Sequence, residues 1–505
     1  MNDTGPAEIP ASVVGEVPSP EIFPSGATSY DLVSKGIVTL EQAQALFDVY
    51  AYRLDHYLYR ILGEGPTLQG IRSSSSLLLA AICTVGSLHS PPHGGLFDRC
   101  YRKFIDLAAA RTFAKDNNHD DIRAFCIGAF WLHDLSWTLI SQGKPSFAHL
   151  ICPICGTNTN TSLAVRISTQ LSLHRTIYKA LSGDKEAYLS TRLYYLVYVC
   201  NHHFSIPYGR ASMARTDESI LACQRLLKTN HVGEDDARLI SQVKLWSIAT
   251  YVLDDFGFDV DRVVSSLLIP SLRRFNIQLE TWRADWSESF GVNNHVGDYP
   301  RKGVGLHYHF AKLYLTSHAF RGVPVPNSHH DYQLSPELEE FAQAAVQSAK
   351  AILRTIITDE EIQSHLNGLP LYFDTMIAFA TVFLLKVATK FATTVRVDSS
   401  DILSLVEDMA HVLKRVNLKM HRKHLLVCIG DGLALLLQRC KEAGHTERLL
   451  SVAAPTPRQQ NMVVDQNDAP SGFDWTDYDL LLSSQDAPIG GNFDTWPMNF
   501  EFPNP

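Results

Sequence analysis

Two cysteines, Cys152 and Cys155, have the spacing with which a chain supplies half of a tetrahedral zinc site. A structural site needs four ligands, and only His149 and His133 stand nearby as further donors. The chain contains no second close cysteine pair. We therefore expect no metal here and interpret residues 140–162 as an inserted surface loop, with an in-frame retained intron as the alternative.

Aspartates form a second group that could do chemistry. Asp254, Asp255 and Asp259 lie close together on a predicted helix, and Asp401 and Asp408 follow about 150 residues later. In class I terpene cyclases, carboxylates at comparable positions hold Mg²⁺ against a diphosphate. Here no Arg-Tyr motif follows, and the same residues also suit a helix end and a helix cap. A terpene-cyclase-like enzyme using Asp254 and Asp255 stays an alternative, but we expect no enzyme and no catalytic residue.

Histidines also occur in pairs, His202 with His203 and His307 with His309. Neighbouring residues on a helix point about 100° apart, and residues two apart diverge further, so neither pair is suited to share a metal ion. We expect partly buried polar packing for them. The sequence shows no glycine-rich phosphate loop, nucleophile elbow or paired zinc-helix motif, so we expect no cofactor in this chain.

The elements that must carry these residues are helices. Apolar residues recur at helical spacing through the middle of the chain, and no useful alternating pattern appears, so we predict an all-α fold. The predicted helices span residues 39–63, 76–90, 96–113, 121–139, 234–256, 261–282 with a kink at Pro270, 305–320, 335–349, 371–391, 401–416 and 421–440. We predict three regions: a disordered N-terminal tail (1–36), a large helical domain (37–445) and a disordered acidic and aromatic tail (446–505).

The most distinctive predicted helix lies in residues 190–220. One apolar face is formed by Leu193, Leu196, Val197 and Cys200. We expect Arg192 and Asn201 to remain outside that face, and Pro207 and Gly209 to turn the chain after it. The stretch is predicted to be an architectural corner.

Composition, targeting signals and cysteine placement indicate the cellular compartment of the protein. Of the 505 residues, 45% are hydrophobic, and the formal net charge is -9. The N-terminus has no basic region followed by an apolar block, and the apolar run 375–385 is too short to cross a bilayer. Most of the nine cysteines lie inside apolar helical patterns, as reduced thiols do. We expect a soluble intracellular protein without a membrane partner.

Six segments in colinear order resemble the regulatory domain of fungal zinc-cluster transcription factors, closest to weak-acid-resistance regulators and protease-gene activators. They are IRSSSSLLLAAICTVGSLHS (71–90), CIGAFWLHDLSWTL (126–139), LAVRISTQLSLHR (163–175), RLYYLVYVCNHHFSIPYGR (192–210), LHYHFAKLYLTSHAFRG (306–322) and FDTMIAFATVFLLKVAT (373–389). The resemblance covers residues 40–445 and implies a nuclear regulator of a metabolic or biosynthetic gene set. It makes His202, His203, Pro207, Gly209 and Arg210 family-signature residues with a structural role.

The family binds DNA through an N-terminal module in which six cysteines hold two zinc ions. This chain has no cysteine before Cys83 and no basic residue before Lys35. We therefore do not expect this chain itself to bind DNA, and expect it to act through a DNA-bound partner or as a homodimer. A gene model that begins downstream of the module is one explanation. A truncated co-regulator or helical scaffold is the alternative function.

The tail, residues 459–505, contains eight acidic residues and no Lys, Arg or His. Large apolar side chains alternate with these acids, which is typical of activation domains. We expect the tail to bind a coactivator or the transcription machinery. The predicted contact residues are Phe473, Trp475, Tyr478, Leu481, Phe493, Trp496 and Phe500.

Overall fold

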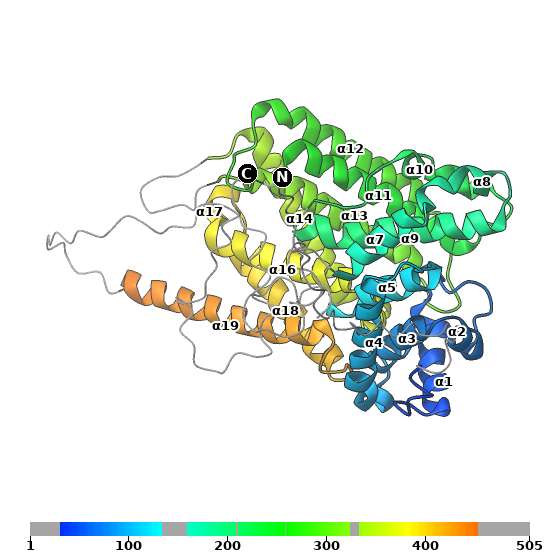
Figure 1. Cartoon of the computed structure of the whole chain (residues 1–505). Helices are drawn as coiled ribbons and strands as arrows, with labels where there is room; N and C mark the ends of the chain where they lie inside the picture. Colours follow the sequence, from blue (N-terminus) through cyan, green and yellow to red (C-terminus); the bar gives the residue numbers. More distant parts are fainter. Residues whose placement is uncertain (1–30, 134–158, 209–210, 258, 324–332, 453–505) are drawn as a thin grey trace, which may run out of the picture.

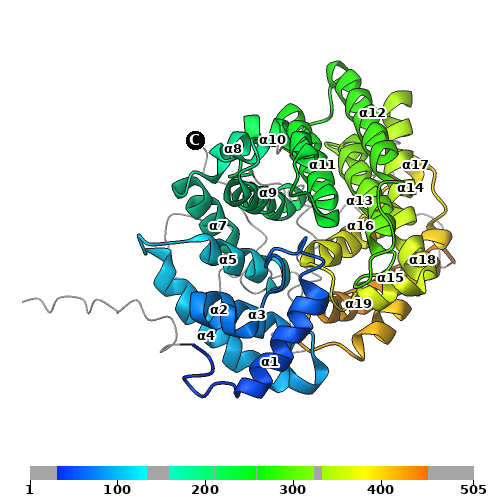
Figure 2. The same ribbon diagram turned by 90° about the vertical axis from the view of Figure 1, so that its right-hand side faces the viewer.

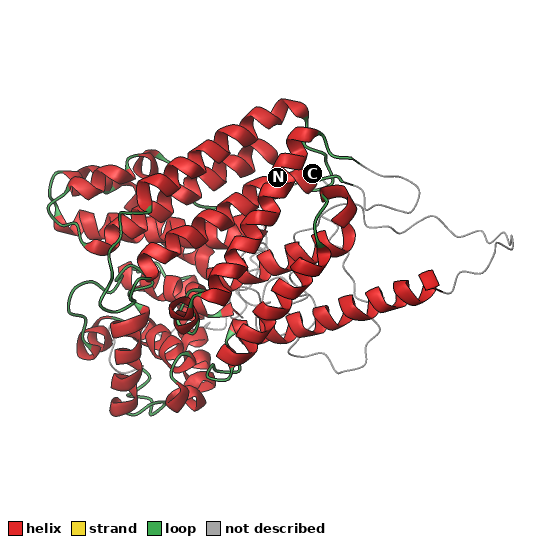
Figure 3. Cartoon of the chain, turned by 180° about the vertical axis from the view of Figure 1, so that it is seen from behind, coloured by secondary structure: helices red, strands yellow, loops and turns green. Residues whose placement is uncertain are grey.

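Helices make up every regular element in the part of the chain that the structure describes (Figure 3). This computed structural model describes residues 31–133, 159–208, 211–257, 259–323 and 333–452. Within those ranges, extended pairing is limited to one isolated bridge between Asn293 and Gly297. The all-α prediction is confirmed.

The first half of the chain contributes nine α-helices and one π-helical turn to the described residues. They are α1 (Leu40–Val49), η2 (Tyr50–Leu54), α2 (Leu68–Ser74), α3 (Ser76–Leu88), α4 (Phe97–Thr112), α5 (His119–Trp131), α7 (Thr159–Gln170), α8 (Ile177–Leu181), α9 (Lys185–Ser205) and α10 (Glu218–Leu221). Short 3₁₀ turns are η3 (Pro91–Leu96), η5 (Leu173–Arg175), η6 (Ile206–Tyr208) and η7 (Cys223–Lys228).

The second half contributes longer helices. They are α11 (Glu234–Phe256), α12 (Ile269–Trp286), α13 (Tyr299–Thr316), α14 (Pro336–Thr358), α15 (Glu360–His365), α16 (Leu371–Lys390), α17 (Ala392–Val395), α18 (Ser399–Asn417) and α19 (Leu425–Val452), with 3₁₀ turns η8 (Ser266–Leu268) and η9 (Ser317–Phe320).

The helices pack mainly against their neighbours in sequence. Contacts run from α3 to α5, α7, α9, α11, α12, α13, α14, α16, α18 and α19 in that order. Figure 2 shows the result as a ring of helices, in which α16 comes back beside α5. The indole N–H of Trp131 on α5 donates to the carbonyl oxygen of Gly368, just before α16, at 3.1 Å. This bond joins the early and late helices of the ring.

The first helix ends earlier than predicted. A capping box begins α1, because Thr39 and Gln42 each accept the other's backbone N–H. Helix α1 ends at Val49, and the chain continues through η2 into a turn rather than on to residue 63. In that turn Tyr59 and Arg60 have φ of 57° and 52°. Two consecutive left-handed residues with side chains cannot continue a helix.

Two other helix predictions need correction. Pro270 does not kink a helix spanning 261–282 but lies in the first turn of α12, where its missing N–H leaves no bond unmade. Asp401 does not cap α18, because Asp398 occupies that position and accepts from the amides of Ser400 and Asp401. By contrast, Ser335 caps α14 and accepts from Leu338 N–H.

Helix α16 is the most apolar long helix in the described residues. It has 20 residues with a mean hydropathy of 1.7 over its best window, so it is long enough to span a bilayer. The prediction that this apolar segment is too short to cross a bilayer, based on residues 375–385, was therefore wrong. However, 94% of that window is buried inside the protein. Helix α16 packs among α14, α18 and α19, so it is hydrophobic because it is a core helix.

Candidate functional site

Helix α9, the predicted signature helix, lies at the centre of the candidate site. Asp184 caps it by accepting from Ala187 N–H at 3.0 Å. Nearly every side chain from Ala187 to Ser205 is buried, because α5, α7, α8 and α11 all pack against the helix. Arg192 and Asn201 were predicted to lie outside, but they are only 8% and 4% exposed. The prediction failed because a helix enclosed on all sides has no outer face.

Arg192 is satisfied by an ion pair across the helix interface. Its Nε pairs with Asp236 of α11, and its second guanidinium nitrogen donates to the carbonyl oxygen of Tyr59 at 2.7 Å. Asp236 also accepts from the Tyr188 hydroxyl at 2.5 Å and from Gly233 N–H at 2.6 Å. The Asp236 carboxylate thus connects the start of α11 to α9. Through Arg192 it is also linked to the turn after η2.

A second ion pair lies beside the first. Arg238 pairs with Asp235 and donates to the carbonyl oxygen of His56. We call Arg192, Arg238, Asp235 and Asp236 the buried ion cluster. Both arginines donate to carbonyls of the 55–62 turn, so the cluster holds this backbone, with its left-handed residues, in place.

Asp55 starts that turn and is also buried. Burial raises its pKa to about 7, although Leu62 N–H partly offsets this by donating to the carboxylate. The Tyr50 hydroxyl lies 3.4 Å from the same carboxyl group. Perturbed carboxyls often mark functional sites, but here the turn is enclosed by protein, so the arrangement fits a structural clamp.

The end of α9 organises the loop that follows it. The side-chain oxygen of Asn201 accepts from Ser212 Oγ at 2.7 Å, Met213 N–H at 2.9 Å and Ala214 N–H at 3.0 Å. Pro207 is buried in η6. These contacts hold the chain in a turn after α9, and the role of the signature residues in this corner stays a prediction.

The two adjacent histidines of α9 point to different partners, and both are fully buried rather than partly buried as predicted. His202 bonds within its own helix, with Nδ1 2.7 Å from the carbonyl oxygen of Tyr198, while burial lowers its pKa to about 4. His203 instead stacks on Tyr372 of α16, with ring centroids 4.2 Å apart. No group of three or more His, Cys, Asp or Glu in the described residues is arranged to hold a metal.

Tyr372 joins His203 to two further rings. His307 of α13 stacks on Tyr372 at 5.5 Å, and Trp246 of α11 meets it edge-on at 5.2 Å. We call these four residues the imidazole–aromatic stack. Both nitrogens of His203, His307 Nδ1, Trp246 Nε1 and the Tyr372 hydroxyl have no hydrogen-bond partner in the described protein. Burial lowers the pKa of His307 to about 3, so the stack is uncharged.

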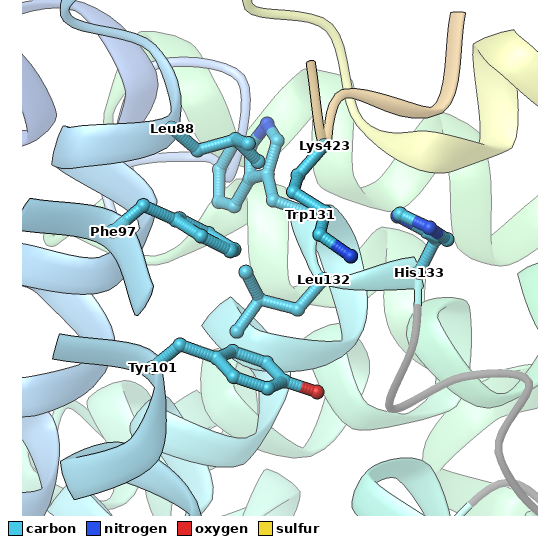
Figure 4. A pocket seen from close by; sticks show the side chains of 7 residues that line it. All are labelled: Leu88, Phe97, Tyr101, Trp131, Leu132, His133 and Lys423. Atoms are coloured by element: carbon cyan, nitrogen blue, oxygen red, sulfur yellow. The ribbon is translucent and has the colours of Figure 1, made fainter. Parts of the chain in front are cut away.

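A small hollow lies at the C-terminal end of α5 (Figure 4). It is lined by Leu88, Phe97, Tyr101, Trp131, Leu132, His133 and Lys423, and it is too narrow to admit a water molecule. Its walls are mainly aromatic and aliphatic, and Lys423 is the one side chain among them that carries a fixed charge. So narrow and mainly apolar a hollow fits side-chain packing rather than a binding or catalytic site.

The aspartates of the alternative enzyme interpretation are engaged separately in this structure. Asp255 pairs with Arg274 at 2.8 Å on the surface, and Asp401 pairs with Lys350 at 2.7 Å. Asp254 is exposed on α11. Each of the two paired carboxylates faces a cation of its own rather than a shared metal position.

Other predicted site residues lie outside the described residues. These are Cys152, Cys155, Gly209, Arg210 and the tail residues Phe473, Trp475, Tyr478, Leu481, Phe493, Trp496 and Phe500.

The sequence carries a known family pattern over most of the described body. The family model for the middle domain of the transcriptional activator of proteases prtT matches residues 36–433. The chain belongs to this family. The match runs from just before α1 into α19, and so includes the buried ion cluster and the imidazole–aromatic stack.

Two curated proteins show the extent of the similarity. The transcriptional activator of proteases prtT from Emericella nidulans is 34% identical over 418 residues, which is 81% of this chain and 59% of the relative. Protein priB from Lentinula edodes is 24% identical over 321 residues, 62% of this chain and 48% of the relative. The chain thus spans about half to three fifths of these relatives. No solved structure matches it.

Within this prtT-like domain, sequence reasoning missed the buried ion cluster. Asp235 and Asp236 follow Gly233 in the first turn of α11, where acidic residues are common because they suit the helix dipole. Arg192 stands in a helix that was interpreted as having a solvent face. The sequence did contain a signal that all faces of α9 are buried, because residues 193–200 are apolar or aromatic without interruption. Such a run leaves no polar side toward water.

Proposed function

We propose that the protein is a fungal regulator of transcription, with the helical body as its regulatory domain and the acidic tail as its activating segment. The family match over residues 36–433 is the observation that carries this proposal. The name of the Emericella nidulans relative makes protease genes the first gene set to test. The site of action is the nucleus.

The geometry of the body supports regulation rather than catalysis. Its polar groups form a buried clamp and an uncharged ring stack, and the aspartates considered for metal binding face lysine and arginine. The chemistry of the tail supports activation. Acidic residues alternate there with aromatic ones, and a coactivator groove can bury such aromatic side chains as a short amphipathic helix.

The test is a fusion of residues 459–505 to an unrelated DNA-binding domain in a reporter strain. We expect activation, and we expect a matched fusion with Phe473→Ala, Trp475→Ala and Leu481→Ala to lose most of it at equal protein level. An inert parent fusion would rule out the activating tail. Deletion of the gene should also lower protease transcripts, and unchanged transcripts would exclude that gene set.

A further inference from the structure

The connection between α18 and α19 carries a concentration of positive charge. Residues 409–430 contain five Lys and Arg residues and no Asp or Glu. Arg415 donates to the side-chain oxygen of Gln363. The other four, Lys414, Lys419, Arg422 and Lys423, are exposed or half-buried. We call these four residues the basic corner.

The charge of the basic corner is poorly neutralised. In the described part of the protein, Lys414, Lys419 and Lys423 have no ion-pair partner. Arg422 lies 3.9 Å from Asp98 of α4, but both side chains are mostly exposed, so this pair contributes little. The nearest acids along the chain are Asp408 and Asp431, on the helices to either side.

Apolar surface accompanies this charge. Leu418 stands between Lys414 and Lys419 and is 83% exposed, so an apolar side chain lies within the basic surface. Lys423 also lines the aromatic hollow with Phe97. A partner that matches the basic corner must therefore combine carboxylates with large apolar side chains. The phosphate backbone of a nucleic acid duplex offers negative charge, but its bases are stacked inside the duplex and leave no apolar surface beside the phosphates for Leu418.

One segment of the same chain has this composition. Residues 473–482, FDWTDYDLLL, carry three aspartates, three aromatic residues and three leucines without a base. We propose that this segment binds the basic corner of its own chain and is thereby withheld from coactivators. The withholding of a coactivator rests on the proposed function, whereas the contact itself does not.

The chain is long enough for this contact. Helix α19 runs from the basic corner away from the body (Figure 1), and its 28 residues span about 40 Å at 1.5 Å per residue. Residues 453–472 follow, and 20 residues reach up to about 68 Å when extended. The segment can therefore return to the corner from which α19 starts.

The strength of such a contact suits a reversible switch. Exposed ion pairs contribute little individually and are screened by salt, so the contact depends on several pairs together with burial of Leu418. A coactivator that buries the same aromatic residues competes directly with the corner. Docking should weaken as ionic strength rises.

Hydrogen–deuterium exchange of the full chain tests the contact. In the parent chain we expect the amides of residues 473–482 to be protected at low salt and less protected at high salt. Lys414→Glu with Lys419→Glu should reduce this protection about tenfold, equivalent to about 1.4 kcal/mol. The matched control is Lys179→Glu with Lys228→Glu, two exposed lysines near α8 and η7 on a distant part of the body, which should leave it unchanged (Figures 1 and 2).

Carbodiimide cross-linking of the dilute full chain gives an independent measurement. We expect amide links between tail aspartates and Lys414 or Lys419 within one molecule. Equal exchange in the corner variant and the control, or links only between molecules, would overturn the proposal. Loss of DNA binding by the corner variant, without any change in tail exchange, would instead assign the corner to nucleic acid.

The outcomes separate this inference from the proposed function. A tail that activates when fused elsewhere but is unprotected in the full chain contradicts only the docking contact. A tail that is protected but inert in the fusion contradicts only activation. Thermal melting of both double variants checks that the charge reversals leave the body folded.

Discussion

Arg192 of α9 and Asp236 of α11 form an ion pair whose side chains are both buried. The pair lies next to a second one, between Arg238 and Asp235, and both arginines also hold carbonyl oxygens of the 55–62 turn. The 55–62 turn is therefore fixed to α9 and α11 by charge as well as by hydrophobic packing. Loss of one charge leaves its partner without compensation.

Arg192→Ala should lower the free energy of unfolding by about 3–5 kcal/mol, because removing one partner of a buried pair strands the other charge. Urea unfolding followed by circular dichroism measures the change. The matched control is Arg274→Ala, which removes an exposed pair with Asp255 and should cost about 1 kcal/mol or less. Equal losses of unfolding free energy in the two variants would show that the buried ion pair contributes no more to stability than the exposed one.

Acid should destabilise the body between pH 6.5 and about pH 4. Burial lowers the pKa of His89, His307 and His318 to about 3 and of His202 to about 4. In that pH window these histidines bind protons in the unfolded chain but stay neutral in the folded chain. The stability present above pH 6.5 is therefore lost as pH falls.

Asp55 acts in the opposite direction. Its folded pKa is raised to about 7, so its contribution favours folding at low pH and is lost as pH rises from 3.8 to 7. Because four buried histidines oppose this single aspartate, we expect the urea midpoint of unfolding to fall as the pH is lowered from 7 to 5. Asp55→Asn should steepen that fall. A midpoint that rises toward pH 5 would contradict the neutral buried histidines.

Much of the fold could be predicted from the sequence, because apolar periodicity and caps are local signals. Helix α11 has its predicted bounds, and Ser335 caps α14 as expected. The turn at Tyr59 and Arg60 could not be predicted, since ordinary residues there take left-handed conformations that only distant contacts make tolerable. The partners of Arg192 and His203 lie far away in sequence, which is why local patterns did not identify either cluster.

Tyr372→Phe should leave the free energy of unfolding unchanged or raise it by about 1 kcal/mol. The hydroxyl is buried without a hydrogen-bond partner in the described protein, so its removal relieves a desolvation cost. The phenyl ring keeps its stacking with His203 and His307. Chemical unfolding of the variant is the measurement. A loss above about 1 kcal/mol would mean that the hydroxyl bonds to a bound water or ligand within the imidazole–aromatic stack.

Asn201 provides the sharpest test of the corner after α9. One side-chain oxygen accepts from Ser212, Met213 and Ala214, and the asparagine itself is buried. Asn201→Ala leaves the buried N–H of Ala214 without its acceptor and should cost about 1–3 kcal/mol.

Asn201→Asp keeps an oxygen at the same position, so it should retain the order of the 211–215 loop that Asn201→Ala loses. Hydrogen exchange at Met213 and Ala214 separates the two variants: fast exchange in the alanine variant and slow exchange in the aspartate variant are expected. Slow exchange in both would show that the backbone of this loop is held by packing, and that the corner does not depend on its asparagine.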